Sequence, residues 1–266
     1  MAKLSKAQLK AHSQAMEILA TDKPLSGQDK WFVMENWRPT ASKVTGSDAF
    51  FTPMPIAMNL AMSTYDEGHI LDLCAGIGRL SFAMLERARY WPRLRITALE
   101  MNPEFVEVGR KVLPEVEWIT GDMLDENLWE GLGPFTAVVS NPPFGNTKAK
   151  PKWLKYHGKL SLMAAEIAVR KTLERSGTFI FPQSICPFRY SGVREYTEIP
   201  KKRMDRETLK FMDLYPEVEW RVSSFDVSHT EFDETDIPVE IVNLEGGEPN
   251  PLRGLPLFEV INESLL

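Results

Sequence analysis

The stretch that decides the fold runs from residue 70 to residue 78 and reads Ile-Leu-Asp-Leu-Cys-Ala-Gly-Ile-Gly. Its first half is a short apolar run of the kind that forms a buried strand. Gly76 and Gly78 then allow the backbone to turn and to pass close to a ligand before a helix begins. The residues that follow predict that helix over 80–89. The stretch therefore predicts a strand, a glycine-rich turn and a helix.

The same alternation continues along the chain. Apolar, β-branched segments predict strands at 94–100, 116–120, 135–140 and 178–182, and helices are expected at 103–112 and 161–175. Such alternation is typical of a mostly parallel sheet that is covered on both faces. Two last strands, at 217–227 and 238–244, have no helix between them, which predicts an antiparallel finish. We expect a doubly wound α/β fold with seven strands.

The chain ahead of this pattern is helical. Apolar residues at helical spacing predict a helix over 5–20, a second is expected over 28–37, and a third ends near residue 65. We therefore predict an N-terminal helical extension over 1–48 and one α/β domain over 49–266. A short insertion near 184–213 follows the fifth strand.

Composition narrows the class of protein. The 266 residues are 43% hydrophobic, with no long apolar run and no apolar signal core near the N-terminus. We expect no membrane segment and a cytoplasmic location. Two cysteines, Cys74 and Cys186, without a Cys/His cluster predict neither a disulfide framework nor a metal site. The net charge is −6, and residues 213–266 hold 13 acidic and two basic side chains, so the remainder is mildly basic.

Polar or glycine-rich residues follow each of the first four strands. The glycine-rich turn after the first strand could by itself be only a tight connection, since the third glycine of a dinucleotide fingerprint is missing. Glu100 ends the second strand, where an acidic residue can hold ribose hydroxyls, and Gly121-Asp122 follows the third. Carboxyl ends of parallel strands meet at one edge of a sheet. Together these residues predict a site for a cofactor that carries adenosine.

The fourth strand is followed by Asn141-Pro142-Pro143-Phe144. A planar amine is a poor nucleophile because its lone pair is delocalised. The Asn141 side-chain oxygen and the Pro142 carbonyl can accept hydrogen bonds from such an NH2 group, and Phe144 can stack on a base rotated out of a helix. The motif therefore indicates methylation of a planar amine, with a rigid turn at a strand end as the alternative.

Together with Phe51-Thr52-Pro53 ahead of the first strand, these motifs resemble the class I S-adenosylmethionine-dependent methyltransferases. The Phe-Thr-Pro segment looks most like that of the bacterial and phage N6-adenine DNA methyltransferases. The resemblance implies a Rossmann-like methyltransferase fold and S-adenosyl-L-methionine as the cofactor. It implies that Thr52 and Pro53 lie beside the methionine part, that Glu100 holds the ribose, and that Met101 packs on the adenine. The implied cofactor-binding residues are Phe51, Thr52, Pro53, Asp72, Cys74, Ala75, Gly76, Gly78, Glu100, Met101, Asp122, Met123 and Asn141, and the implied catalytic residues are Asn141, Pro142, Pro143 and Phe144.

Basic residues interleaved with aromatic ones follow Phe144. Lysines suit phosphate contact and aromatic rings suit base stacking, so this stretch predicts a surface for nucleic acid. A second basic stretch lies in the insertion, and either stretch could instead be a solvated face. The predicted nucleic-acid-binding residues are Lys148, Lys150, Lys152, Trp153, Lys155, Tyr156, Lys201, Lys202 and Arg203.

The sequence therefore predicts an enzyme, a DNA adenine-N6 methyltransferase that acts on a flipped adenine. Because no large recognition domain remains, we expect short or loose sequence specificity. A methyltransferase of adenine or guanine amines in ribosomal RNA is the main alternative. Two further alternatives are a protein glutamine methyltransferase and a non-catalytic binding subunit. Cys186-Pro187 does not match a cytosine-C5 nucleophile, because those enzymes place Pro-Cys after the fourth strand, where this chain has Asn-Pro-Pro-Phe.

Overall fold

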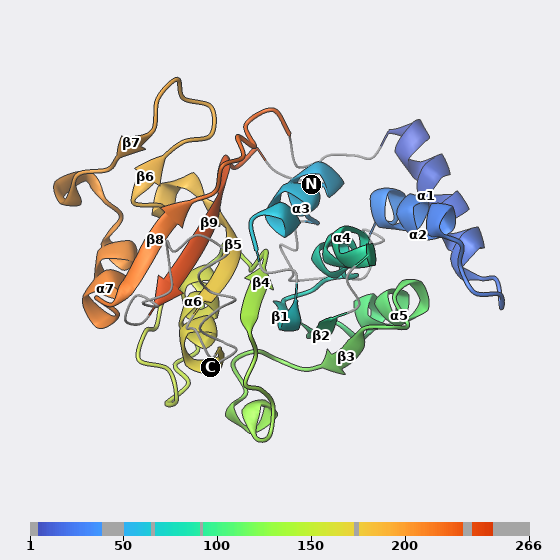
Figure 1. Ribbon diagram of the computed structural model, residues 1–266, viewed down its shortest axis with the longest axis horizontal. Coiled ribbons are helices and arrows are strands. Elements are labelled where there is room, and N and C mark those ends of the chain that lie inside the picture. The colour runs from blue at the N-terminus through green and yellow to red at the C-terminus, as the bar shows by residue number, and fades with distance from the viewer. Residues whose placement is uncertain are drawn as a thin grey trace, which may run out of the picture.

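The computed structural model describes residues 5–38, 51–64, 67–90, 93–172, 176–230 and 236–246. Its centre is a seven-stranded sheet whose strands run in the order β3-β2-β1-β4-β5-β9-β8 (Figure 1). The strands are β1 (Gly68–Leu73), β2 (Leu94–Glu100), β3 (Glu117–Thr120), β4 (Ala137–Ser140), β5 (Ser176–Pro182), β8 (Val218–Val222) and β9 (Val239–Gly246). The predicted α/β fold is confirmed.

The order of the strands reverses at β1, which lies between β2 and β4. β1 pairs in parallel with both neighbours, and β3 and β5 extend the parallel region on either side. β9 is antiparallel to β5 and to β8, as the missing helix between the last two strands predicted. In open α/β sheets, ligands bind beside the carboxyl ends of strands at the point where the order reverses.

Helices cover the sheet on both faces. On one face lie α1 (Lys6–Leu19), α2 (Gly27–Asn36), α3 (Met54–Met62), α4 (Arg79–Arg87) and α5 (Pro103–Val112), and on the other lie α6 (Leu160–Lys171) and α7 (Arg206–Leu214). Successive strand residues point to opposite faces. Ile70 packs with the first group and Leu71 with the second, so β1 supplies both cores.

Local sequence explains where several helices begin. Ser5 and Ser26 cap α1 and α2, and each accepts a hydrogen bond from a backbone N–H in the first turn. Asn102 caps α5 in the same way, with Pro103 at the first helical position. Both predicted N-terminal helices are present. The predicted domain boundary between residues 48 and 49 lies outside the described residues.

The insertion after β5 contains more structure than the sequence predicted. It holds a two-stranded ribbon of β6 (Phe188–Arg189) and β7 (Thr197–Glu198), and the helix α7, which the sequence analysis missed. Asp205 caps the start of α7, and its carboxylate accepts hydrogen bonds from the backbone N–H groups of Glu207 and Thr208. Its Phe211 is fully buried. The insertion is therefore part of the second core.

The described chain also contains four short 3-10 turns, η1 (Ala88–Tyr90), η2 (Glu126–Trp129), η3 (Gln183–Ile185) and η4 (Lys201–Arg203).

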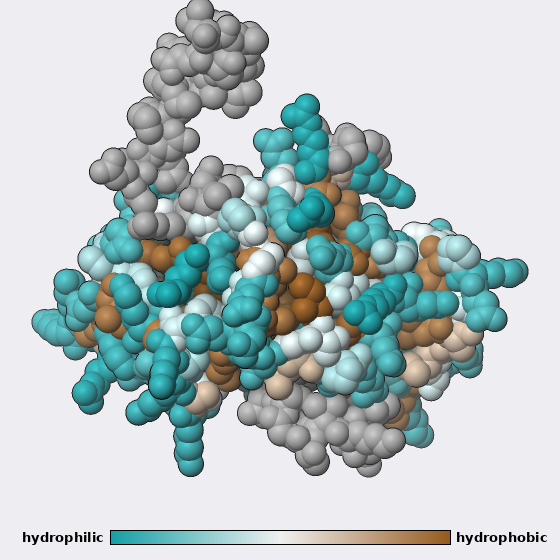
Figure 2. All heavy atoms as spheres, turned by 90° about the horizontal axis from the view of Figure 1, so that it is seen from below, coloured by the Kyte–Doolittle hydropathy of each residue, from teal (hydrophilic) through white to brown (hydrophobic). Residues whose placement is uncertain are grey.

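Figure 2 shows one face of the molecule, which is mainly hydrophilic, with hydrophobic residues visible between the charged ones. Within the described ranges, no helix has both the length and the apolar character that a membrane span requires. The same ranges contain no group of three His, Cys, Asp or Glu side chains placed to hold a metal ion.

Candidate active site

A cavity of about 690 Å³ lies beside the carboxyl ends of β1, β2, β3 and β4. Its volume is within the range of small-molecule sites, about 300–1,000 Å³. The polar residues predicted at the four strand ends therefore do converge. The predicted residues that line this cavity are Phe51, Thr52, Cys74, Ala75, Gly76, Glu100, Met101, Asp122, Met123, Asn141, Pro142, Pro143 and Phe144.

The glycine-rich turn forms part of the cavity wall. Gly76 and Gly78 have φ angles of 58° and 89°, in the left-handed region that favours glycine. Cys74 adopts φ 63° without that freedom. A Cβ on Gly76 would lie 3.2 Å from the ring of Phe51, so the turn and this ring are in close contact. Gly78 ends the turn and does not line the cavity.

Asp72 is fully buried behind the same turn and does not line the cavity either. Its Oδ2 accepts hydrogen bonds from the backbone N of Ser81 at 3.0 Å and from Ser81 Oγ at 2.6 Å. Its Oδ1 makes no hydrogen bond to the described residues. Burial raises the pKa of Asp72 to about 6, although the Ser81 hydrogen bonds oppose that shift. In the structure, Asp72 supports the start of α4.

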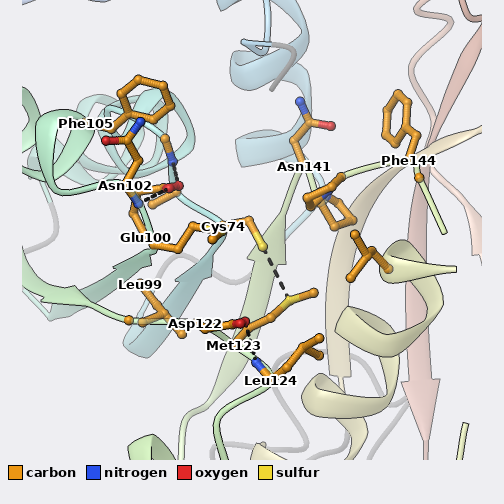
Figure 3. A pocket seen from close by; sticks show the side chains of 18 of the residues that line it. Cys74, Leu99, Glu100, Asn102, Phe105, Asp122, Met123, Leu124, Asn141 and Phe144 are labelled. Carbon is orange, nitrogen blue, oxygen red and sulfur yellow. Dashed lines mark hydrogen bonds between the residues drawn. The ribbon is translucent and has the colours of Figure 1, made fainter. Parts of the chain in front are cut away.

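Glu100 stands at the end of β2 and is 8% exposed. Its two carboxylate oxygens accept hydrogen bonds from the backbone N–H groups of Gly76 and Asn102, both at 2.8 Å. Burial raises the pKa of Glu100, and the two backbone hydrogen bonds oppose this. Figure 3 shows Glu100 and Asn102 on one side of the pocket. A carboxylate here can accept hydrogen bonds from a pair of hydroxyl groups.

The lower part of the pocket is more apolar. Leu99 and Met123 line it, and the Cys74 thiol lies 3.5 Å from the Met123 sulfur (Figure 3). Asp122 is at its edge, where Oδ1 accepts a hydrogen bond from the Leu124 backbone N at 2.9 Å. Burial, followed by the nearby carboxylates, raises the pKa of Cys74, which disfavours a reactive thiolate. A flat aromatic group fits this apolar region.

Met101 lines the cavity but is 67% exposed. Its side chain therefore lies at the rim of the cavity, and its packing on an adenine stays a prediction. Pro53, which the sequence placed beside the methionine part of the cofactor, does not line the cavity.

Asn141 and Phe144 lie across the pocket from Glu100 (Figure 3). Asn141 is half-buried at the end of β4, and its Nδ2 donates a hydrogen bond to Thr52 Oγ1 at 2.9 Å. Phe144 is half-buried, and Pro142 between them is buried. The structure therefore brings the Asn-Pro-Pro-Phe motif and the glycine-rich turn to the same cavity.

The basic stretch after Phe144 forms one rim of the cavity, through Asn146, Thr147 and Ala149. Lys148, Lys150, Lys152 and Lys155 are exposed. Trp153 is half-buried, and its indole N–H donates a hydrogen bond to the Leu124 carbonyl at 3.0 Å.

The prediction that Tyr156 stacks on a base is wrong. Tyr156 is 0% exposed and packs against Phe211, with ring centres 5.8 Å apart. Its hydroxyl donates to Glu207 at 2.8 Å. Tyr156 is a core residue that joins the basic stretch to α7.

Glu166 of α6, fully buried, fixes this stretch further. Its carboxylate accepts hydrogen bonds from the backbone N–H groups of Lys155 and Tyr156, both at 2.7 Å, and from the Tyr215 hydroxyl. The second basic stretch forms η4, in which Lys201, Lys202 and Arg203 are exposed and do not line the cavity.

Sequence reasoning missed several residues of the cavity, among them Arg79, Phe105 and Asn146. Arg79 is 5% exposed and donates hydrogen bonds to the Thr52 carbonyl at 3.0 Å and to the Trp37 carbonyl at 3.3 Å. Phe105 packs edge-on against Phe51, with ring centres 5.2 Å apart. The position of Arg79 directly after the glycine-rich turn was the signal available for it.

Comparison with known proteins supports the same interpretation of the cavity. Residues 54–165 match the methyltransferase small domain family. Over 95 residues the chain is 33% identical to ribosomal RNA small subunit methyltransferase C of Salmonella arizonae, covering 34% of this chain and 27% of that protein. It is 27% identical to trans-aconitate 2-methyltransferase of Azoarcus sp., covering 36% and 32%. The chain thus spans about a third or less of these curated relatives.

Two solved structures share the fold. A structure described as a class I S-adenosylmethionine-dependent methyltransferase, from Listeria monocytogenes, has a TM-score of 0.57 at 12% identity, covering 89% of this chain and 69% of that one. The methyltransferase subunit of a type I restriction-modification system from Streptococcus thermophilus has a TM-score of 0.52 at 17% identity, covering 76% and 46%.

The cofactor of this class is S-adenosyl-L-methionine, and the residues of the cavity fit it. Glu100 offers a buried carboxylate for hydroxyl groups, and the region around Leu99 and Met123 offers an apolar surface for a base. Residues 54–165 therefore match a methyltransferase domain, and the sheet has the fold of the class I S-adenosylmethionine-dependent methyltransferases.

Proposed function

We propose that this protein transfers the methyl group of S-adenosylmethionine to the N6 amine of adenine in DNA. The observation that carries the proposal is the position of Asn141-Pro142-Pro143-Phe144, which lines the same cavity as the glycine-rich turn and Glu100. A methyl donor and an amine acceptor would therefore meet in one cavity.

The residues of this motif can activate the amine. The Pro142 carbonyl and the Asn141 side-chain oxygen accept hydrogen bonds from the NH2 group, which returns electron density to the nitrogen as it attacks. Phe144 stacks on the base and holds it in a fixed orientation, so that attack is in line with the methyl group. The cofactor supplies the activated methyl group. No side chain has to act as a nucleophile in this chemistry.

The exposed lysines support a polynucleotide as the substrate. Lys148, Lys150 and Lys152 are exposed and belong to the stretch that forms the rim through Asn146, Thr147 and Ala149. From there they can contact the phosphates on either side of a flipped base. Burial of Tyr156 removes one predicted stacking residue and leaves Phe144 and the half-buried Trp153 for that role.

Methylation of an amine in ribosomal RNA is the second candidate. It is favoured by the 33% identity to a ribosomal RNA methyltransferase over a stretch of 95 residues. The proposed chemistry of Asn141 and Phe144 is the same for either polymer, so only the substrate distinguishes the two functions.

Tritiated S-adenosylmethionine, offered to unmethylated DNA, ribosomal RNA and a protein lysate in parallel, tests the proposal. Digestion of labelled DNA to nucleosides is expected to give N6-methyldeoxyadenosine. The Asn141→Ala variant should lose this label, whereas Asn127→Ala, a change at an exposed asparagine outside the cavity, should keep it. Label in RNA alone would support the second candidate, and label in protein alone or in no polymer would refute both.

A further inference from the structure

The Asn141 side chain has a defined neighbour that the motif itself does not include. Its Nδ2 donates a hydrogen bond of 2.9 Å to Thr52 Oγ1, although the two residues are 89 positions apart in the sequence. Thr52 lies just before α3, and both residues line the cavity. The contact therefore joins the segment before the sheet to the end of β4.

The orientation of an asparagine amide decides what it can do for an amine. Its oxygen can only accept a hydrogen bond and its nitrogen can only donate. An NH2 group of a substrate needs an acceptor. An Asn141 amide turned by 180° would present two donors to that group and would repel it.

Thr52 is well placed to hold the amide in the productive orientation. Thr52 is only 5% exposed, so water does not compete freely for the Thr52 hydroxyl. Its backbone carbonyl accepts a hydrogen bond from the buried guanidinium of Arg79 at 3.0 Å. Arg79 also lies over the ring of Phe51, 5.3 Å from its centre. These contacts hold the backbone of Thr52 through its carbonyl and leave its hydroxyl to the Asn141 amide.

From this geometry we infer that Thr52 is a positioning residue, whose hydroxyl binds the nitrogen of the Asn141 amide and so directs the oxygen toward the amine of the substrate. The inference rests on the proposed function and adds to it a residue that sets the reactivity of the motif. Thr52 takes no part in the bonds that form or break.

A double-mutant cycle tests the orientation. Thr52→Val keeps the shape of the side chain and its backbone contact with Arg79, but removes the hydroxyl. Loss of one hydrogen bond that fixes the amide is expected to lower kcat about tenfold, with a smaller change in the KM for DNA. Thr52→Ser, which keeps the hydroxyl, should recover most of that loss.

The decisive background is Asn141→Asp, because both ends of a carboxylate are oxygen atoms and the group has no wrong orientation. In this background Thr52→Val is expected to change kcat no more than about twofold. An equal loss of kcat in both backgrounds would overturn the inference, since Thr52 would then act through the cofactor or through packing.

A second measurement does not depend on activity. The side-chain NH2 signals of Asn141 in a ¹⁵N-labelled sample can be identified by their absence in Asn141→Asp. A hydrogen-bonded proton is expected downfield and protected from exchange in the wild type, shifted upfield in Thr52→Val, and restored in Thr52→Ser. Signals that do not move in Thr52→Val would overturn the inference. If the wild type methylates no polymer, the proposed function fails while this measurement still decides the orientation of the amide.

Discussion

The buried carboxyl of Asp72 should make the stability of this protein fall as the pH rises from about 4 to about 7. Burial raises the pKa of Asp72 from the ordinary value of 3.8 to about 6 in the folded state. The folded protein then binds the proton more tightly than the unfolded chain does. This contribution to stability is complete below pH 3.8 and is lost as the pH rises through about 6.

The magnitude follows from the two pKa values. A difference of about 2 pKa units corresponds to roughly 3 kcal/mol, and about 2 kcal/mol of this falls between about pH 4 and pH 7. The variant Asp72→Asn removes the titration but keeps an oxygen that can accept the hydrogen bonds from Ser81. The free energy of unfolding of the variant minus that of the wild type should therefore rise by about 2 kcal/mol across this range.

Urea denaturation of both proteins at several pH values, monitored by tryptophan fluorescence, measures this difference. Groups that titrate in the same way in both proteins cancel from it. Asp213→Asn is the matched control, because Asp213 is exposed on α7, and its difference curve should be flat. A flat curve for Asp72→Asn would refute the reasoning, and so would a curve that falls with pH.

Three further predictions follow from the site. Lys148→Ala, Lys150→Ala and Lys152→Ala combined should reduce the salt dependence of DNA binding by about 0.9 in log–log slope for each phosphate that the variant no longer neutralises, measured by fluorescence anisotropy. An unaltered slope for this triple variant would contradict the prediction. The control variant Lys6→Ala with Lys10→Ala, two exposed positions on α1, should leave the slope unaltered. Glu166→Ala leaves two buried backbone N–H groups and the Tyr215 hydroxyl without their acceptor, so it should cost roughly 3 kcal/mol of stability in urea denaturation; a loss below about 1 kcal/mol would show that water replaces the carboxylate. Gly76→Ala places a Cβ 3.2 Å from the Phe51 ring at φ 58°, and should weaken binding of S-adenosylhomocysteine about tenfold in calorimetry; unchanged affinity would mean that the turn adapts.

Much of the fold could be predicted because the strands of the sheet are short, apolar and separated by clear breaks. The predicted strand at 94–100 and the predicted helix at 103–112 agree with β2 and α5 in both bounds. The ends of the other strands differ by a few residues, and the largest difference is at β8, predicted over 217–227 and observed as Val218–Val222. There Ser223 makes one more backbone hydrogen bond to Ile241 of β9, and the residues beyond it do not extend the paired register.

The sequence analysis missed the helix α7 and gave Tyr156 a surface role, and these two errors have one cause. Nine residues of α7 follow a run of lysines and arginines, and their many charges obscured the apolar side that carries Phe211. Without α7, nothing in the sequence indicated a partner for Tyr156, so its position among lysines suggested a surface role. Phe211 of α7 packs against the ring of Tyr156, and Glu207 of α7 binds its hydroxyl. Burial depends on neighbours that are distant in the sequence, which local patterns do not report.

The cavity could be predicted for a different reason. A parallel sheet brings the ends of consecutive strands to one edge whatever their separation in sequence, so polar residues at those ends must converge. The sequence could not predict how these residues bind one another before any ligand is present. Glu100 holds the turn through Gly76, and Asn141 binds Thr52, two interactions that only the spatial arrangement reveals.

The N-terminal extension has a direct structural connection to this cavity. Trp37, at the end of α2, is 2% exposed and packs edge-on against both Phe51 and Phe105, with ring centres 5.7 Å away in each case. Its carbonyl accepts a hydrogen bond from Arg79, which also binds the Thr52 carbonyl. Since Phe51 and Thr52 line the cavity, the extension supports the wall that holds the Asn141 amide. A segment that shares no motif with the methyltransferase domain is thus continuous with the core on which its site depends.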